Sequence, residues 1–170
     1  MMRAELYKVA FGGPGTLSIM ARPRGGDWLP DEIQAWRDAT VVVVVSLLTN
    51  DEREELDLRD ESLLCEHHGL TFISYPIQDR DVPQQINEAK SVIEGLAYQI
   101  SKGKHIAIHC RMGIGRAAMI AATTLVKLGG LSERAFAMVQ EARGYDVPDT
   151  PEQRERVEHF SACKDTDSTM

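Results

Sequence analysis

The segment 105–116 constrains the fold of this chain more than any other part of its sequence. It begins with the largely apolar run 105–109, which predicts a buried strand, and continues through a short loop that contains Gly113 and Gly115. A helix is predicted directly after this loop, over 116–128. Such a loop can turn several backbone N–H groups toward one centre, and the start of the helix adds its partial positive charge there. We therefore expect an oxyanion to bind at this loop.

Two side chains of the same segment carry the chemistry that we expect at the loop. Cys110 directly follows the strand, and a thiolate is stabilised at the start of a helix and close to a guanidinium group. Arg116 can supply that guanidinium group and offer two parallel hydrogen bonds to a phosphate. The intervening glycines permit the close approach of the backbone that such a loop needs. The spacing therefore predicts a cysteine nucleophile that faces a bound oxyanion.

Strands alternate with helices along the rest of the chain. The run 41–48 is continuous and rich in β-branched residues, which is typical of a central parallel strand covered on both faces. A further strand is predicted at 71–77, and a short edge strand at 17–21. The spacing of apolar residues predicts helices at 31–39, 51–65, 83–102, 132–143 and 151–160.

This alternation predicts an α/β fold of one domain. Its 170 residues, 43% of them hydrophobic, can bury one sizeable core. We expect a central, mainly parallel, twisted sheet flanked by helices on both faces. The domain is expected to span 1–164, and a polar tail to follow at 165–170.

The charge and the cysteines exclude several classes of function. A formal net charge of −7 disfavours binding to nucleic acid or to an anionic membrane, because both depend on clustered lysine and arginine. Cys65, Cys110 and Cys163 follow no metal-binding spacing, so we expect no metal and no cofactor. The odd number of cysteines and the lack of a long apolar segment favour a cytoplasmic protein. We expect it to be a monomer.

The eight residues from His109 to Arg116 resemble the His-Cys-x-x-Gly-x-x-Arg phosphate loop of the cysteine-based protein tyrosine phosphatase superfamily. The length of the chain is similar to that of the compact dual-specificity members. The resemblance implies that the Cys110 thiolate attacks a phosphomonoester, forms a cysteinyl-phosphate, and is released by water without a metal. It also implies that His109 fixes the loop and tunes the thiolate. The residues implied to contact the substrate are Arg111, Met112, Gly113, Ile114 and Gly115.

The family protonates the leaving group with an aspartate on a loop upstream of the nucleophile. Asp79 and Asp81 are the two candidates, and we favour Asp79 because it lies closest to the end of the predicted strand. Segment 147–154 is similar to one in which compact members place a Thr and a Gln near the phosphate loop, so Gln153 is a candidate to orient the hydrolytic water. The alternative for Gln153 is an ordinary role at the start of a helix.

One residue departs from the family pattern. The position after the arginine is usually Ser or Thr, whose hydroxyl donates to the departing thiolate, and here it is Ala117. This predicts slow breakdown of the cysteinyl-phosphate. The leading hypothesis is a phosphatase for phosphotyrosine in proteins, with phosphoserine and phosphothreonine as further substrates. The alternatives are a phosphatase for phosphoinositides or other non-protein monoesters, or a catalytically weak phosphate-binding module. Cys65 is expected to be a core residue rather than a disulfide partner of Cys110.

Overall fold

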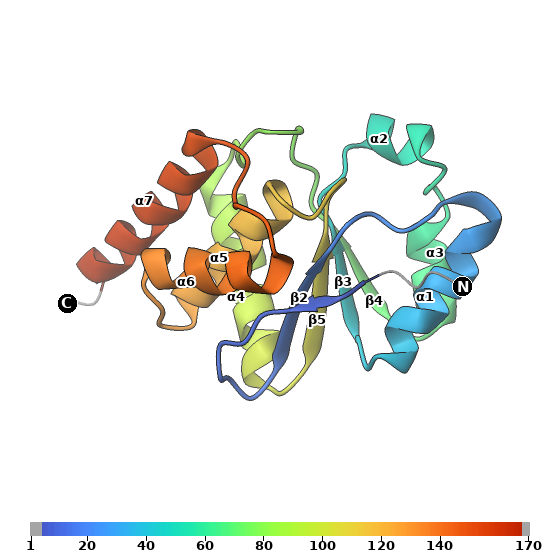
Figure 1. The fold of residues 1–170 in the computed structure, drawn as a ribbon, viewed down its shortest axis with the longest axis horizontal. Helices are drawn as coiled ribbons and strands as arrows, with labels where there is room; N and C mark the ends of the chain where they lie inside the picture. Colours follow the sequence, from blue (N-terminus) through green and yellow to red (C-terminus); the bar gives the residue numbers. More distant parts are fainter. Residues whose placement is uncertain (1–4, 168–170) are drawn as a thin grey trace.

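The computed structural model describes the backbone of residues 5–167 and the side chains of residues 5–161. A five-stranded sheet runs through its centre in the order β1-β2-β5-β3-β4, and only the β1–β2 pair is antiparallel (Figure 1). The predicted fold class, an α/β domain with a mainly parallel sheet, is confirmed. The strands are β1 (Tyr7–Lys8), β2 (Thr16–Met20), β3 (Val43–Ser46), β4 (Thr71–Ser74) and β5 (His105–His109).

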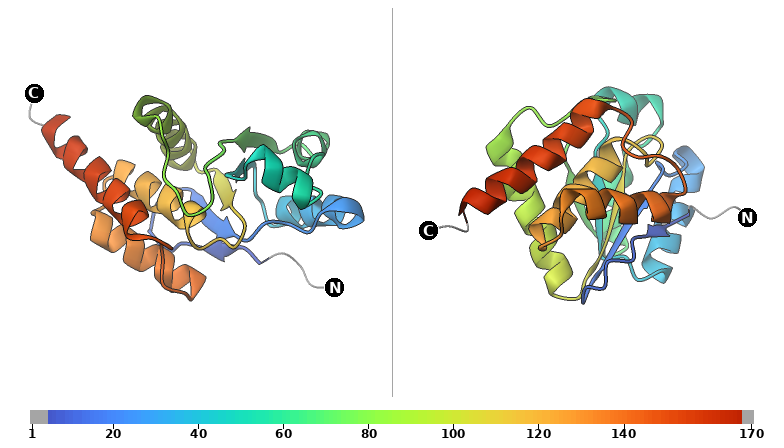
Figure 2. Two further views of the ribbon diagram at one scale, coloured as in Figure 1. Left: turned by 90° about the horizontal axis from the view of Figure 1, so that it is seen from above. Right: turned by 60° about the vertical axis from the view of Figure 1, so that its left-hand side comes forward.

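Helices cover both faces of this sheet (Figures 1 and 2). One face carries α1 (Leu29–Asp38) and α3 (Glu61–His67), with the short helices η1 (Gly26–Trp28) and α2 (Asn50–Glu55) in the neighbouring connections. The other face carries α4 (Ile86–Ser101), α5 (Arg116–Lys127), α6 (Ser132–Arg143) and α7 (Pro151–Asp167). No helix in the described part of the chain is long and apolar enough to span a membrane.

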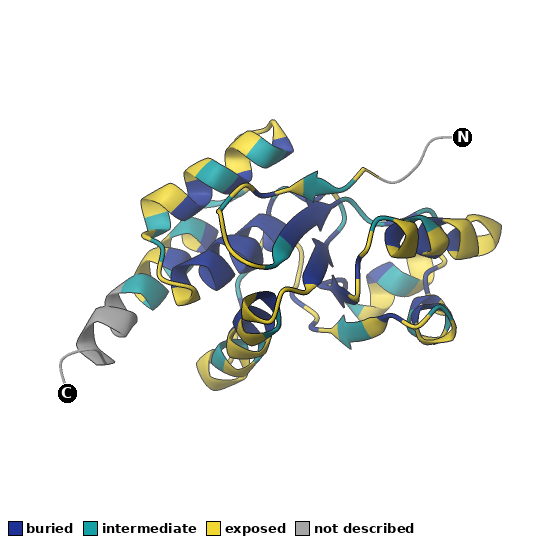
Figure 3. Cartoon of the chain, turned by 90° about the horizontal axis from the view of Figure 1, so that it is seen from below, coloured by how far each residue is buried: buried dark blue, intermediate teal, exposed yellow. Residues whose placement is uncertain are grey.

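The alternation of side chains along the strands creates two separate cores. On β5, Ile106 and Ile108 pack toward α4 and α5, while Ala107 packs toward α1 and α3. The central strands are therefore buried on both faces, as Figure 3 shows in dark blue. The same alternation decides in which direction each side chain at the end of β5 points.

Three local predictions are wrong. The strand predicted at 17–21 is not at an edge, because β1 pairs with it on one side and β5 on the other. The helix predicted at 51–65 is two helices, α2 and α3, separated by a turn in which Asp57 has a left-handed φ of 56°. The turn places the side chain of Leu58 in the core, fully buried. The helix predicted at 151–160 instead ends at Asp167, as α7; residues 168–170 of the predicted polar tail lie outside the described part.

Candidate active site

The loop between β5 and α5 lies at the carboxyl edge of the sheet, where ligands bind in open α/β folds. Cys110 follows the last residue of β5 and is only 3% exposed. The backbone N–H of Gly113 donates to the Cys110 Sγ over 3.3 Å. Gly113 has a φ of +74°, and a Cβ there would lie 2.7 Å from the backbone of Met20. The loop therefore needs glycine at this position to turn back against β2.

Arg116 begins α5 and is buried, with its guanidinium group held on several sides. Nη1 and Nη2 donate to the two carboxylate oxygens of Glu52 over 2.7 and 2.9 Å, and Nη1 also donates to the carbonyl oxygen of Ile77 over 2.8 Å. Nη2 lies 3.2 Å from Asp79 Oδ1. Nε–H takes part in none of these contacts and can donate to an oxyanion, whereas Nη2 already contacts Glu52 and Asp79.

Sequence reasoning missed Glu52, the residue that orients Arg116. It lies three residues after Thr49, and the two form a capping box at the start of α2, which holds its backbone and carboxylate in place. Burial opposes its ionisation, but hydrogen bonds from Arg116 and from the Thr49 N–H lower the pKa of Glu52 to about 2. A Thr-x-x-Glu signature was present in the sequence and indicated the cap, although not the contact with Arg116.

Replacing Glu52 with glutamine is expected to lower the free energy of unfolding by about 2–4 kcal/mol at pH 7, because it leaves a buried guanidinium without its counter-charge. The loss should depend on pH. The pKa of Glu52 is depressed in the folded protein, so its contribution is complete above the unfolded value of 4.5 and disappears as the pH falls toward 2. Denaturant unfolding of both proteins between pH 3 and 7 measures this difference.

The matched control is Glu54→Gln on the same helix, because Glu54 is exposed. This variant should unfold with a free energy within about 0.5 kcal/mol of the wild type at every pH. A constant difference between wild type and Glu52→Gln over the whole pH range would contradict the ion pair.

The two candidate acids point in different directions. Asp79 is 57% exposed at its side chain and contacts Arg116. The carboxylate of Asp81 accepts hydrogen bonds from the Val82 N–H over 2.8 Å and from the Gln84 side chain over 3.3 Å, so it is turned into its own loop. Arg80, between the two aspartates, has a left-handed φ of 63°, which contributes to this divergence. The geometry brings Asp79, and not the carboxylate of Asp81, to Arg116.

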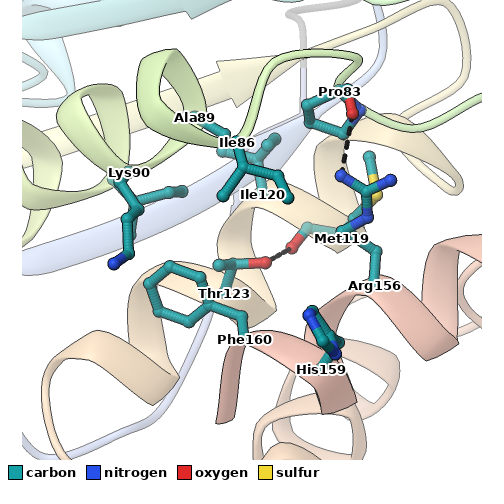
Figure 4. A pocket seen from close by; sticks show the side chains of 11 residues that line it. Pro83, Ile86, Ala89, Lys90, Met119, Ile120, Thr123, Arg156, His159 and Phe160 are labelled. Atoms are coloured by element: carbon teal, nitrogen blue, oxygen red, sulfur yellow. Dashed lines mark hydrogen bonds between the residues drawn. The ribbon is translucent and has the colours of Figure 1, made fainter. Parts of the chain in front are cut away.

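Helix α7 holds this loop in place. Gln153 is fully buried and donates to the carbonyl oxygen of Asp81 over 3.1 Å, while its own side-chain oxygen accepts from the Thr150 N–H. Arg156 donates to the carbonyl oxygen of Pro83 over 2.9 Å, above a small apolar cavity of about 120 Å³ between α4, α5 and α7 (Figure 4). The Nε2 end of Gln153 thus joins α7 to the loop of Asp79 and Asp81, whereas its oxygen satisfies a backbone N–H directly before α7 itself.

Some of the remaining loop residues pack inside the protein or form ion pairs, and others face the solvent. Arg111 is paired with Glu52 and Glu55, over 3.4 and 3.0 Å, so its charge is already compensated. Met112 is 59% exposed, whereas Ile114 packs against the core. A Cβ on Gly115 would lie 2.3 Å from the carboxylate of Asp149, so glycine admits that carboxylate next to the loop.

Ala117 and Cys65, the two other positions that the sequence singled out, are fully buried. Ala117 places a methyl group in the core where a hydroxyl was expected from the family pattern. Cys65, on α3, belongs to the core on the opposite face of the sheet from Cys110. In the described part of the chain no three His, Cys, Asp or Glu side chains lie together so that they could hold a metal ion.

Comparison with known proteins identifies similar sequences. A family model described as "Polymorphic toxin system, DSP-PTPase phosphatase" matches residues 19–130. Protein tyrosine phosphatase type IVA 3 of Mus musculus is 27% identical over 107 residues, which is 62% of this chain and 56% of the mouse protein. The chain thus matches only a little over half the length of this relative.

Solved structures share the fold. Kinase associated phosphatase, with its catalytic-site cysteine replaced by serine, superposes with a TM-score of 0.87 at 17% identity, covering 100% of this chain and 99% of its own. Tk-PTP in its active form gives 0.72 at 21% identity, with 86% and 91% covered. PTPMT1 in complex with PI(5)P gives 0.71 at 17% identity, with 89% and 94% covered.

Proposed function

The chain belongs to the DSP-PTPase phosphatase family of polymorphic toxin systems, and on this premise we propose that it hydrolyses phosphotyrosine in proteins, without a metal, through a cysteinyl-phosphate. Phosphoserine and phosphothreonine are further candidate substrates. The observation that supports the proposal is the arrangement of Arg116, whose Nη1 and Nη2 are held by Glu52 while its Nε–H remains available to a phosphate. Asp79 contacts the same guanidinium group, and Cys110 acts on it electrostatically.

In the first step, the Cys110 thiolate attacks phosphorus in line with the ester oxygen. The P–S bond forms as the P–O bond breaks, and the oxygen leaves with a proton from Asp79. Water then attacks phosphorus, gives its proton to Asp79, and releases phosphate and the thiolate. The second step is expected to be slow, because Ala117 offers no hydroxyl to the departing sulfur.

The charges around the loop favour a phosphate on a protein over a phosphoinositide. The basic residue inside the loop, Arg111, is engaged by Glu52 and Glu55, and the carboxylate of Asp149 lies against Gly115. A headgroup that brings a second phosphate would meet these carboxylates, and like charges in contact cost several kcal/mol. PTPMT1, solved with PI(5)P, remains the reason to test the lipid directly.

The test is hydrolysis of three substrates in the presence of EDTA and reductant: p-nitrophenyl phosphate, a phosphotyrosine peptide with neutral flanks, and PI(5)P in neutral vesicles. We expect all activity to survive chelation and kcat/KM for the peptide to exceed that for PI(5)P by at least about tenfold. The rate should pass through a maximum between pH 5 and 8, because one group must be ionised and another protonated.

Three results would change the proposal. Loss of activity with EDTA would show that a metal takes part. A preference for PI(5)P would make the chain a phosphatase of non-protein monoesters. The absence of hydrolysis together with retained vanadate binding would indicate a phosphate-binding module, and Ala117→Ser would then be the first variant to make.

A further inference from the structure

The side chain that precedes the nucleophile points away from it. Because side chains alternate along β5, His109 lies on the face covered by α1 and α3, while Cys110 lies on the face covered by α5. The His109 Nε2 atom lies 2.6 Å from the Glu61 Oε1 atom, and both side chains are fully buried. The Trp36 ring lies beside them, with its centroid 6.3 Å from that of the imidazole. Glu61 is the first residue of α3 and is remote from the loop in sequence.

The contacts of Glu61 determine where the proton of this pair resides. Its second oxygen, Oε2, is buried and has no hydrogen-bond partner among the described residues. An ionised carboxylate buried without a cation costs several kcal/mol, so His109 must supply the compensating proton.

The second ring nitrogen supports this assignment. His109 Nδ1 lies 3.4 Å from the carbonyl oxygen of Cys110, and Nε2 faces the Glu61 carboxylate. Both neighbours are acceptors when Glu61 is ionised, and only an imidazolium can then donate to both. The ring thus lies between the carbonyl group of Cys110 and the carboxylate of Glu61.

We propose that Glu61 is a positioning residue for the nucleophile: it holds His109 as an imidazolium behind Cys110, and the positive end of this buried pair stabilises the Cys110 thiolate. The inference deepens the proposed function and rests on it for its catalytic meaning. The proposed effect is on how readily the Cys110 thiol ionises, which can be measured without any substrate.

Other charged groups surround the pair and the thiol. On α3, Cys65 follows Glu61 by one turn, and burial, with a smaller effect of Glu61, raises the pKa of its thiol to about 12, so it stays neutral. On α1 the neighbour is Trp36, which does not titrate. Arg116 also acts on Cys110, but Glu52 and Asp79 compensate its charge. The imidazolium is thus a cation beside the carbonyl group of Cys110, with its counter-ion at the opposite ring nitrogen.

The test measures the rate at which iodoacetamide alkylates Cys110 between pH 4 and 9, with the modified residue identified by mass spectrometry. Glu61→Gln keeps the size and a hydrogen bond but removes the charge. We expect it to raise the midpoint of the alkylation profile by about one pH unit, and so to slow alkylation about tenfold below the midpoint. Glu61→Asp, which retains the charge, should recover most of this shift. Glu66→Gln, at an exposed position of the same helix, should leave the profile unchanged.

A merely structural role gives a different result. It would lower the Tm of Glu61→Gln and leave the midpoint where it is in the wild type, which overturns the inference. Should Glu61→Gln fail to fold, His109→Asn removes the cation directly and must raise the midpoint by a similar amount; an unchanged midpoint there also overturns it. A raised midpoint in a protein that hydrolyses no phosphomonoester would contradict the proposed function and leave this inference standing.

Discussion

Replacing Cys110 with serine is expected to reduce turnover of p-nitrophenyl phosphate by at least ~10⁴-fold, because a serine hydroxyl is not ionised at neutral pH and is a far weaker nucleophile than a thiolate. Binding of vanadate should persist, since the loop N–H groups and the guanidinium group of Arg116 remain. Steady-state rates and vanadate titration of the two purified proteins measure both effects.

Cys65→Ser is the matched control. Cys65 is buried on the opposite face of the sheet, so this variant should lose some stability and keep its turnover within about threefold of the wild type. If Cys110→Ser retained activity, or if Cys65→Ser lost it as completely, the nucleophile would lie elsewhere.

Replacing Asp79 with asparagine is expected to have the second-largest effect, and one that depends on the leaving group. General acid catalysis contributes about 10²–10⁴-fold when the leaving oxygen is strongly basic. Phenyl phosphate should therefore lose about 10²-fold or more in kcat, whereas p-nitrophenyl phosphate, which releases a stable anion, should lose less than about tenfold. The ratio of the two rates isolates the acid, because the altered contact with Arg116 affects both substrates alike.

Asp81→Asn provides the comparison. Its carboxylate is turned into its own loop, where it accepts from the Val82 N–H, and asparagine retains one oxygen for that bond. We expect this variant to slow both substrates to a similar, small extent. Leaving-group selectivity in Asp81→Asn and not in Asp79→Asn would reassign the general acid.

The fold could be predicted from the sequence to a large extent because its signals are local. The run of valines before Ser46 and the apolar positions of the long helices required a buried sheet with helices on both faces. The errors fell where local signals are weak. A two-residue strand, β1, turned β2 from an edge strand into an interior one, and the buried side chain of Leu58 interrupted a helix that its charged neighbours favoured.

The loop of the candidate site could also be predicted, since Cys110, the glycines and Arg116 lie within seven consecutive residues at the junction of β5 and α5. The choice between Asp79 and Asp81 depended on a single turn. Spacing favoured Asp79, and the left-handed backbone of Arg80 shows how the two carboxylates come to point apart. Only Asp79 lies against Arg116.

The sequence by itself determined the strand–loop–helix unit that holds Cys110 and Arg116 and the sheet that presents it, because those residues are neighbours along the chain and local backbone geometry brings them together. Only the tertiary structure decided which carboxylates complete the site. Glu52 and Glu61 lie 64 and 48 residues from Arg116 and His109, the side chains that they bind. Such pairs form when helices pack on a sheet and buried charges need partners. The spacing of residues along the sequence does not predict which residues will pair in this way.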